Sequence, residues 1–205
     1  MLSEILLVRH GQTESNRTGY YIGWSSEDLD TTGVAQAQRL SSRLAGSPIE
    51  VIYSSPLQRA FTTASIIAGP HHVEVKTLPD LKEVNQGHLQ GAPRSETKNR
   101  FPEFWKQLIE DISQATFPGG ESFAQVAERS LRTFKSIIKE NPDKRVLIVS
   151  HEIVIKIIIM QALGVPYNIY RRFEVGNASL SLLQVQGTSF KLITLNDKSH
   201  LAGID

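Results

Sequence analysis

The sequence predicts an α/β fold, a three-layer α/β/α sandwich with a mostly parallel sheet and a small inserted lid. Apolar runs at residues 5–8, 51–53 and 146–149 are typical of strands that are buried on both faces of a parallel sheet. Segments with the apolar spacing of helices alternate with these runs. Such alternation indicates a sheet that is covered by helices on both sides.

Length and composition limit the class of protein. The 205 residues suit a single domain of generous size, residues 1–205. A net charge of +1 exerts no long-range attraction on nucleic acid or on an anionic membrane, so we expect a small-molecule partner at a local site. The lack of cysteine excludes disulfides, thiolate metal sites and cysteine nucleophiles.

The sequence gives no sign of targeting to a membrane or for secretion. No signal peptide precedes the first apolar run. The most apolar segment, residues 153–163, is too short to span a bilayer and contains Lys156. We therefore expect a cytoplasmic protein, whose oligomeric state the sequence does not indicate.

In the first half of the chain, a polar loop at residues 12–30 follows the first strand. A helix capped by Thr31 or Thr32 is expected next, and it should lead to the second apolar run. Ser55 and Pro56 then predict a second helix, with serine as its cap and proline at its first position.

Residues 79–120 lack a clear period and form the predicted lid. A short and more exposed strand around Val73 and Val75 precedes them. The lid is rich in glycine and proline, but it also contains the aromatic residues Phe101, Phe104, Trp105 and Phe117. Turn residues combined with aromatic residues predict a segment that is irregular yet packed.

The second half predicts two helices and a hairpin. Ser122 and Gln125 form a capping-box pattern at the start of a long helix. Another helix is expected after the third apolar run. Residues 179–185 and 190–195 should then close the sheet as an antiparallel hairpin across Gly187.

Polar side chains follow each of the three apolar runs. They are Arg9 and His10 after the first run, Ser54, Ser55 and Arg59 after the second, and Ser150 and His151 after the third. Because open α/β sheets bind ligands at the carboxyl ends of their strands, these residues should share one pocket. The sequence therefore predicts a site that contains two arginines and two histidines.

Such a pocket suits a phosphate group. A guanidinium fork matches two phosphate oxygens, and a helix amino terminus near His151 would add N–H donors. A neutral imidazole is a competent nucleophile for a phosphoryl group when its other ring nitrogen carries the proton. A carboxylic acid with a raised pKa could protonate the leaving oxygen. The residues alone leave four candidates for that acid, Asp80, Glu83, Glu96 and Glu103.

The ordered motifs of this chain resemble the histidine phosphatase superfamily, also called the phosphoglycerate mutase-like family. The first of these motifs is Arg-His-Gly-Gln-Thr-Glu at residues 9–14. The others are Asp-Thr-Thr-Gly at 30–33, Ser-Ser-Pro-Leu-Gln-Arg-Ala at 54–60, Pro-Gly-Gly-Glu-Ser at 118–122 and Ser-His at 150–151. A lone Arg-His-Gly would be a weak signal, but this set covers nearly the whole chain in the order and spacing of the family.

The resemblance implies roles for individual residues. His10 would be the nucleophile that becomes phosphorylated, and Glu83 would be the proton donor and acceptor. The residues that would complete the phosphate pocket and bind substrate are Arg9, Asn16, Gly23, Arg59 and His151. The resemblance implies neither a metal ion nor a cofactor.

Members of the family are either phosphatases, which transfer the phosphoryl group to water, or mutases, which return it to a sugar acid. Residues 22–24, Ile-Gly-Trp, resemble the mutase loop. However, mutases follow the catalytic glutamate with arginine, histidine or asparagine, and tyrosine, whereas Val-Asn-Gln stands here at residues 84–86. The short lid and the Pro-Gly-Gly-Glu-Ser motif also resemble the phosphatases. We therefore predict a hydrolase of small phosphorylated metabolites, with a cofactor-dependent phosphoglycerate mutase as the alternative.

Two charged residues near the second histidine have an open role. The family usually has glycine after this histidine, but this chain has Glu152. Its carboxylate could raise the pKa of His151 if it points inward, or it could face solvent on the first helical turn. Lys156, on the same apolar helix, is expected to extend its amine to solvent.

The remaining aromatic and polar residues have simpler expected roles. Six aromatic residues in the first loop and the lid either hold the lid to the domain, which we prefer, or face an apolar or planar substrate: Tyr20, Tyr21, Trp24, Phe101, Phe104 and Trp105. The histidines expected at the surface are His71, His72, His88 and His200. The serines near the strand ends are expected to serve as caps and turn residues.

Two other interpretations use the same site residues. His10, His151 and Glu83 have the donor types of an iron-binding facial triad, but two arginines beside a divalent ion would be repulsive. A binding module that only recognises phosphorylated ligands would need neither a nucleophile nor a proton donor, and this chain contains candidates for both.

Overall fold

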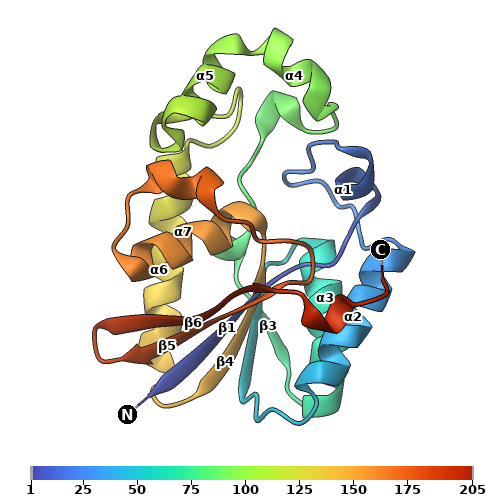
Figure 1. The fold of residues 1–205 in the computed structure, drawn as a ribbon, viewed down its shortest axis with the longest axis vertical. Coiled ribbons are helices and arrows are strands. Elements are labelled where there is room, and N and C mark those ends of the chain that lie inside the picture. Colours follow the sequence, from blue (N-terminus) through green and yellow to red (C-terminus); the bar gives the residue numbers. More distant parts are fainter. Residues whose placement is uncertain (1, 205) are drawn as a thin grey trace.

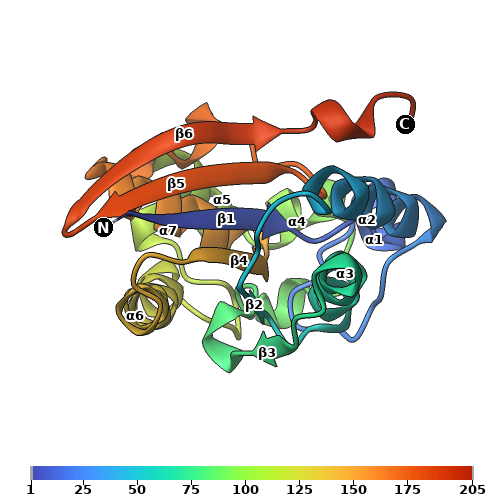
Figure 2. The ribbon, with the colours of Figure 1, turned by 90° about the horizontal axis from the view of Figure 1, so that it is seen from below.

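The computed structural model describes residues 2–204, and it contains one six-stranded sheet. The strand order is β3-β2-β4-β1-β5-β6, and the strands can be followed in this order in Figure 2. The parallel strands are β1 (Ser3–Arg9), β2 (Val51–Ser54), β3 (Val75–Thr77) and β4 (Arg145–Ser150). The antiparallel strands are β5 (Leu180–Gln186) and β6 (Ser189–Asp197), which form the predicted hairpin. The prediction of an α/β fold with a mostly parallel sheet is confirmed.

Helices cover both faces of this sheet (Figures 1 and 2). One face carries α2 (Thr31–Leu44) and α3 (Gln58–Ala68), and the other carries α6 (Phe123–Glu140) and α7 (Glu152–Leu163). Because successive strand side chains point to opposite faces, Leu6 and Val8 pack with α2 and α3, while Ile5 and Leu7 pack with α6 and α7. β1 is therefore the centre of both halves of the core.

Two helices begin at other residues than predicted. Asp30 caps α2, because its carboxylate accepts a hydrogen bond from the Gly33 N–H. The predictions of Thr31 or Thr32 as the cap are therefore wrong. α3 begins only at Gln58, because the Ser55 hydroxyl accepts the Leu57 N–H within the preceding turn and does not cap the helix. The capping box at the start of α6 is confirmed.

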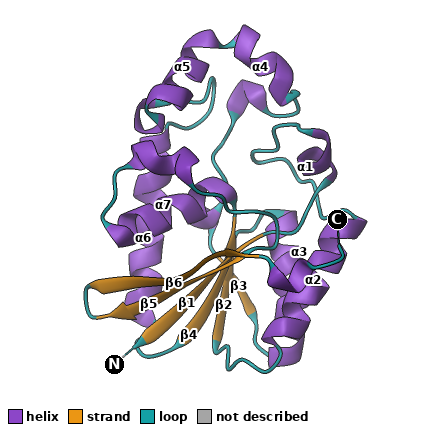
Figure 3. Ribbon diagram, in the orientation of Figure 1, coloured by secondary structure: helices purple, strands orange, loops and turns teal. Residues whose placement is uncertain are grey.

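The lid segment contains more regular structure than predicted. It contains α4 (Arg94–Arg100) and α5 (Pro102–Glu110), which lie at the top of Figure 1. Figure 3 shows these two helices in purple, well above the orange strands of the sheet. α4 buries only Thr97, so its sequence carries no apolar stripe to reveal it. Phe104 and Phe117 pack ring to ring at 4.8 Å and belong to the core, so the lid is packed, as expected.

One further short helix, α1 (Glu14–Thr18), lies in the loop predicted at residues 12–30. Thr13 caps it, and five residues are too few to show a helical period. No helix in the described part of the chain combines the length and apolar character that a membrane span requires.

Candidate active site

The carboxyl ends of β1, β2 and β4 bring the predicted residues together. β1 leads into His10, the turn after β2 leads to Arg59 on α3, and β4 leads to His151 at the start of α7. A cavity of about 360 Å³ opens at this edge of the sheet, below the lid. Its walls include Arg9, His10, Asn16, Gly23, Arg59 and Glu83. The ring of His151 lies behind this wall, with its centre 5.1 Å from that of the His10 ring.

His10 is held in one tautomer. Its Nδ1 lies 2.7 Å from the Gly11 carbonyl oxygen, and because a carbonyl can only accept, Nδ1 carries the proton. Its Nε2 is then free of a proton and accepts a weak hydrogen bond from Arg59 Nε at 3.3 Å. Burial and the charges of Arg59 and Arg9 hold the pKa of His10 well below its usual value. The imidazole is therefore neutral, with its lone pair directed at the guanidinium.

Arg59 is almost fully buried, at 1% exposure. Its Nη1 and Nη2 donate to the carbonyls of Ser25 and Gly23, at 3.2 and 2.8 Å, and these bonds fix its plane. Burial lowers the pKa of Arg59 to about 10, so the group stays charged at neutral pH. Glycine suits position 23: its φ is +52°, and a Cβ there would lie 2.2 Å from the Gln90 side chain, which would have to move.

His151 is buried next to His10. Its Nε2 lies 2.8 Å from Ser55 Oγ, and its Nδ1 has no hydrogen-bond partner among residues 2–204. Burial and the nearby Arg59 keep the pKa of His151 well below its usual value. Ser55 is thus a positioning residue for His151, while Ser150 donates to the Leu81 carbonyl.

Glu152 points inward, toward the cavity, but it does not raise the pKa of His151 as considered from the sequence. It pairs with Arg9 at 3.3 Å and with Lys156 at 2.9 Å. Burial would raise its pKa, but Arg9 and Lys156 outweigh burial and lower the pKa of Glu152. The expectation that the Lys156 amine reaches solvent is wrong, because that side chain is 5% exposed and lines the cavity.

Among the four acids considered from the sequence, Glu83 is the one that lines the cavity. Burial raises the pKa of Glu83, which favours the protonated acid. Its Oε1 accepts the Val84 N–H at 3.0 Å, and its backbone carbonyl accepts the Trp24 indole N–H at 2.6 Å. The other three acids lie outside the cavity: Asp80, Glu96 and Glu103.

Residues 5–198 match the sequence profile of the histidine phosphatase superfamily (branch 1). The chain belongs to this superfamily. A relative with the name phosphoserine phosphatase 1, from Hydrogenobacter thermophilus, is 31% identical over 198 residues, which cover 97% of this chain and 94% of the relative. A probable phosphoglycerate mutase, GpmB, from Proteus mirabilis is 34% identical over 207 residues, with 98% and 96% covered.

A solved structure is similar over the same length. It is a mutant phosphoserine phosphatase from Entamoeba histolytica in complex with phosphoserine, with a TM-score of 0.88 and 28% identity. The match covers 97% of this chain and 99% of that one. The family and these phosphatases confirm the predicted enzyme class, a phosphomonoesterase, and favour it over the mutase alternative.

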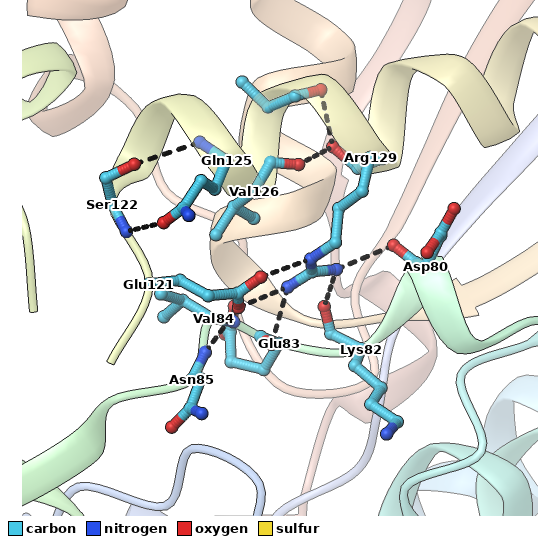
Figure 4. Close-up of polar contacts among 12 residues, drawn as sticks. Asp80, Lys82, Glu83, Val84, Asn85, Glu121, Ser122, Gln125, Val126 and Arg129 are labelled. Atoms are coloured by element: carbon cyan, nitrogen blue, oxygen red, sulfur yellow. Dashed lines mark hydrogen bonds and ion pairs between the residues drawn. The ribbon is translucent and has the colours of Figure 1, made fainter. Parts of the chain in front are cut away.

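This histidine phosphatase holds its Glu83 loop with Arg129 of α6, a residue that the sequence analysis missed. The guanidinium donates to the backbone carbonyls of Asp80, Lys82 and Glu83 at 2.7–2.9 Å. It also pairs with Glu121 at 2.8 Å, which in turn accepts the Asn85 N–H (Figure 4). Glu121 belongs to the Pro-Gly-Gly-Glu-Ser motif, and Arg129 lies on the helix predicted to follow it. The sequence could therefore have indicated Arg129 as an ion-pair partner for this glutamate.

The sequence analysis also missed Asn177, and it did not determine which aromatic residues line the cavity. Asn177 Nδ2 donates to the carbonyls of His10 and Gly11 and to Asn16 Oδ1 at 3.0–3.2 Å, which connects the loop after β1 to the chain before β5. Of the six aromatic residues considered, those that line the cavity are Tyr21 and Trp105. Within residues 2–204, no cluster of three or more histidine, aspartate and glutamate side chains is arranged to bind a metal ion.

Proposed function

We propose that this enzyme hydrolyses small phosphomonoesters through a phosphohistidine formed on His10. The observation that carries the proposal is the fixed tautomer of His10, whose unprotonated Nε2 faces the buried guanidinium of Arg59. In the first step, Nε2 attacks phosphorus in line with the ester bond. The P–N bond forms as the P–O bond breaks, and the ester oxygen leaves with the bonding electrons.

Three groups around His10 suit a phosphoryl group that is being transferred. Arg9 and Arg59 line the cavity and can each bind non-bridging oxygens, whereas the buried ring of His151 lies behind this wall and does not reach them. Asn16 stands in the same wall and can donate its amide N–H. Because these groups are fixed before substrate arrives, little reorganisation accompanies the change in charge.

Glu83 is the proposed general acid and then the general base. Burial raises the pKa of Glu83, which favours the protonated carboxyl, and this carboxyl donates its proton to the leaving oxygen in the first step. The carboxylate that remains can then remove a proton from the water that attacks the phosphohistidine. That step releases inorganic phosphate and restores both His10 and protonated Glu83. The proposed reaction uses no metal ion.

We propose water, rather than a sugar acid, as the acceptor. The group at residues 84–86, Val-Asn-Gln, offers no cation to hold the carboxylate of a sugar acid beside Glu83. A cavity of about 360 Å³ suits a metabolite with a few carbon atoms, such as phosphoserine, rather than a nucleic acid or a membrane surface. Small phosphorylated metabolites are cytoplasmic compounds, so the proposal includes a cytoplasmic enzyme.

Trapping of the intermediate tests the proposal. Brief incubation with ³²P-labelled phosphoserine followed by denaturation in base should give labelled wild-type protein whose label is lost in acid, as for phosphohistidine. His10→Ala should give no label, whereas His72→Ala, an exposed control, should label like the wild type. Release of phosphate without any labelled protein would contradict the covalent step. Interconversion of 2- and 3-phosphoglycerate faster than phosphate release, with added 2,3-bisphosphoglycerate, would show a mutase instead.

A further inference from the structure

A row of three alternating charges lines the cavity next to the phosphate site. Arg9 Nη1 lies 3.3 Å from Glu152 Oε2, and Lys156 Nζ lies 2.9 Å from Glu152 Oε1. All three side chains are part of the same cavity wall. Starting from the arginine of the phosphate site, the order along the wall is therefore cation, anion, cation.

The far end of this row is rigid. The Lys156 side chain is 5% exposed, and its ammonium group lies 4.3 Å from the centre of the Tyr170 ring and 5.5 Å from that of Phe173. The carboxylate of Glu152 and the faces of the two rings offset the cost of burying this charge. Lys156 therefore presents a fixed positive charge to the cavity.

The middle of the row remains accessible. The Glu152 side chain is 30% exposed, and each of its oxygens has one cationic partner within the row. A carboxylate oxygen can accept more than one hydrogen bond, so Glu152 can also receive a donor from the cavity. Arg94 of the lid lines the same cavity and adds positive charge near this carboxylate.

We propose that Glu152 and Lys156 determine specificity for a zwitterionic substrate, an amino acid whose side-chain hydroxyl carries the phosphate. The inference rests on the proposed function, because the phosphate must lie on Arg9. Each charged group of the substrate then faces a residue of opposite charge, as electrostatic complementarity requires. The phosphate faces Arg9, the ammonium group faces Glu152, and the carboxylate faces Lys156.

Other substrate bodies match this wall less well. An apolar body would remove water from three charged groups without replacing their hydrogen bonds. A sugar acid such as 3-phosphoglycerate offers a carboxylate for Lys156 but only a neutral hydroxyl for Glu152. The replacement of the usual glycine by Glu152 therefore introduces selection for an ammonium group.

Partial substrates measure the contribution of each charge. We would compare kcat/KM for phosphoserine, phosphoethanolamine, which lacks the carboxylate, and the phosphate ester of 3-hydroxypropionate, which lacks the ammonium group. Glu152→Gln should lower the ratio of phosphoserine to the 3-hydroxypropionate ester by about 10-fold or more, the effect of one charged hydrogen bond. Lys156→Met should lower the ratio of phosphoserine to phosphoethanolamine by about the same factor. Lys156→Arg, which keeps the charge, should restore most of the second ratio.

Matched controls separate this effect from a general loss of charge. Glu128→Gln and Lys135→Met make the same chemical changes on the exposed face of α6. Both substrate ratios should stay at their wild-type values in these controls. Thermal melting of each variant identifies any that fail to fold, and Lys156→Arg tests the lysine position if Lys156→Met does fail.

The inference and the proposed function can fail separately. If Glu152→Gln and Lys156→Met lower kcat/KM for all three substrates by the same factor, the row is only structural and the inference is wrong. Turnover of p-nitrophenyl phosphate, which has neither charge, would then still support the proposed function. If the wild type hydrolyses none of these four compounds and forms no phosphohistidine, it is the proposed function that fails.

Discussion

His10 and Glu83 have pKa values that the same physical cause shifts in opposite directions. Burial disfavours the charged form of each group, so it lowers the pKa of the imidazole and raises that of the carboxyl. The arginines strengthen the first effect and oppose the second. Burial therefore favours a neutral imidazole and a protonated carboxyl, the two states that the proposed first step requires.

This bias predicts an asymmetric pH profile for kcat/KM with phosphoserine. The nucleophile should remain active below pH 6.5, the ordinary value for histidine, because His10 is protonated only at a lower pH. The rate should fall as the pH rises through the raised pKa of Glu83, because the acid is then lost. The alkaline fall should disappear in Glu83→Gln. Ionisation of the substrate phosphate near pH 6 affects both enzymes and cancels in the ratio of their profiles.

The proposed role of Glu83 as general acid also predicts a dependence on the leaving group. Glu83→Gln should lower kcat/KM for phosphoserine by about 10²-fold or more, because an alkoxide leaves poorly without a proton. The loss for p-nitrophenyl phosphate should be less than about 10-fold, since nitrophenolate needs no proton to leave. Glu96→Gln, on the exposed side of α4, serves as the control. Equal losses for both substrates would show that Glu83 acts in binding and not in proton transfer.

At the scale of elements, the loop that carries Glu83 is fixed to α6 and to the turn before it. Arg129 donates to three backbone carbonyls of this loop, those of Asp80, Lys82 and Glu83, and Glu121 accepts the Asn85 N–H at its far end. Gly120 fits against the same loop, since a Cβ there would lie 2.0 Å from the Asn85 carbonyl oxygen. The position of the acid therefore depends on side chains that never reach the cavity.

Arg129→Ala should affect both stability and catalysis. The change leaves the Glu121 carboxylate and three carbonyls without their partner, so the free energy of unfolding should fall by about 3–5 kcal/mol. Among the molecules that still fold, kcat should fall more than KM rises, because Glu83 is displaced while the phosphate site is intact. Urea denaturation and steady-state kinetics measure the two effects.

Arg132→Ala is the matched control on the same helix. Arg132 pairs with Asp80, but its side chain is 64% exposed, and such surface pairs contribute at most about 1 kcal/mol. We expect a nearly unchanged kcat in this variant. If Arg129→Ala lowers stability and leaves kcat unchanged, Arg129 only stabilises the fold and does not position Glu83.

The sequence predicted best what short, local patterns determine. The apolar runs identified the central strands, and the polar residues at their ends identified His10, Arg59 and His151. Arg129 and Lys156 could not be identified in this way, because a charged residue on a helix looks the same whether it meets solvent or a buried carbonyl. α4 was missed for a related reason, since it packs through the single residue Thr97 and shows no period.

At the scale of the molecule, the site is assembled from parts that are far apart in the chain. Residues 9–23, 54–59, 83–94 and 151–156 all contribute to it. The unfolded chain cannot bring these segments together, so a phosphate ion that occupies the proposed site would bind the folded state alone. Such binding would stabilise the whole protein by mass action.

Inorganic phosphate should accordingly raise Tm. At a concentration of 100 times its Kd, the free energy of unfolding should increase by about 2.7 kcal/mol, which corresponds to about 5–10 °C for a protein of this size. Phosphate also stabilises proteins generally because it is excluded from their surface.

Arg59→Lys separates the two effects. This variant keeps one positive charge but loses the planar guanidinium fork. The part of the Tm shift that comes from specific binding should therefore fall by more than half, while the general part remains. Arg43→Lys, which changes an arginine outside the cavity, should keep the full shift. Differential scanning fluorimetry at constant ionic strength measures both, and an equal shift in wild type and Arg59→Lys would contradict phosphate binding by Arg59.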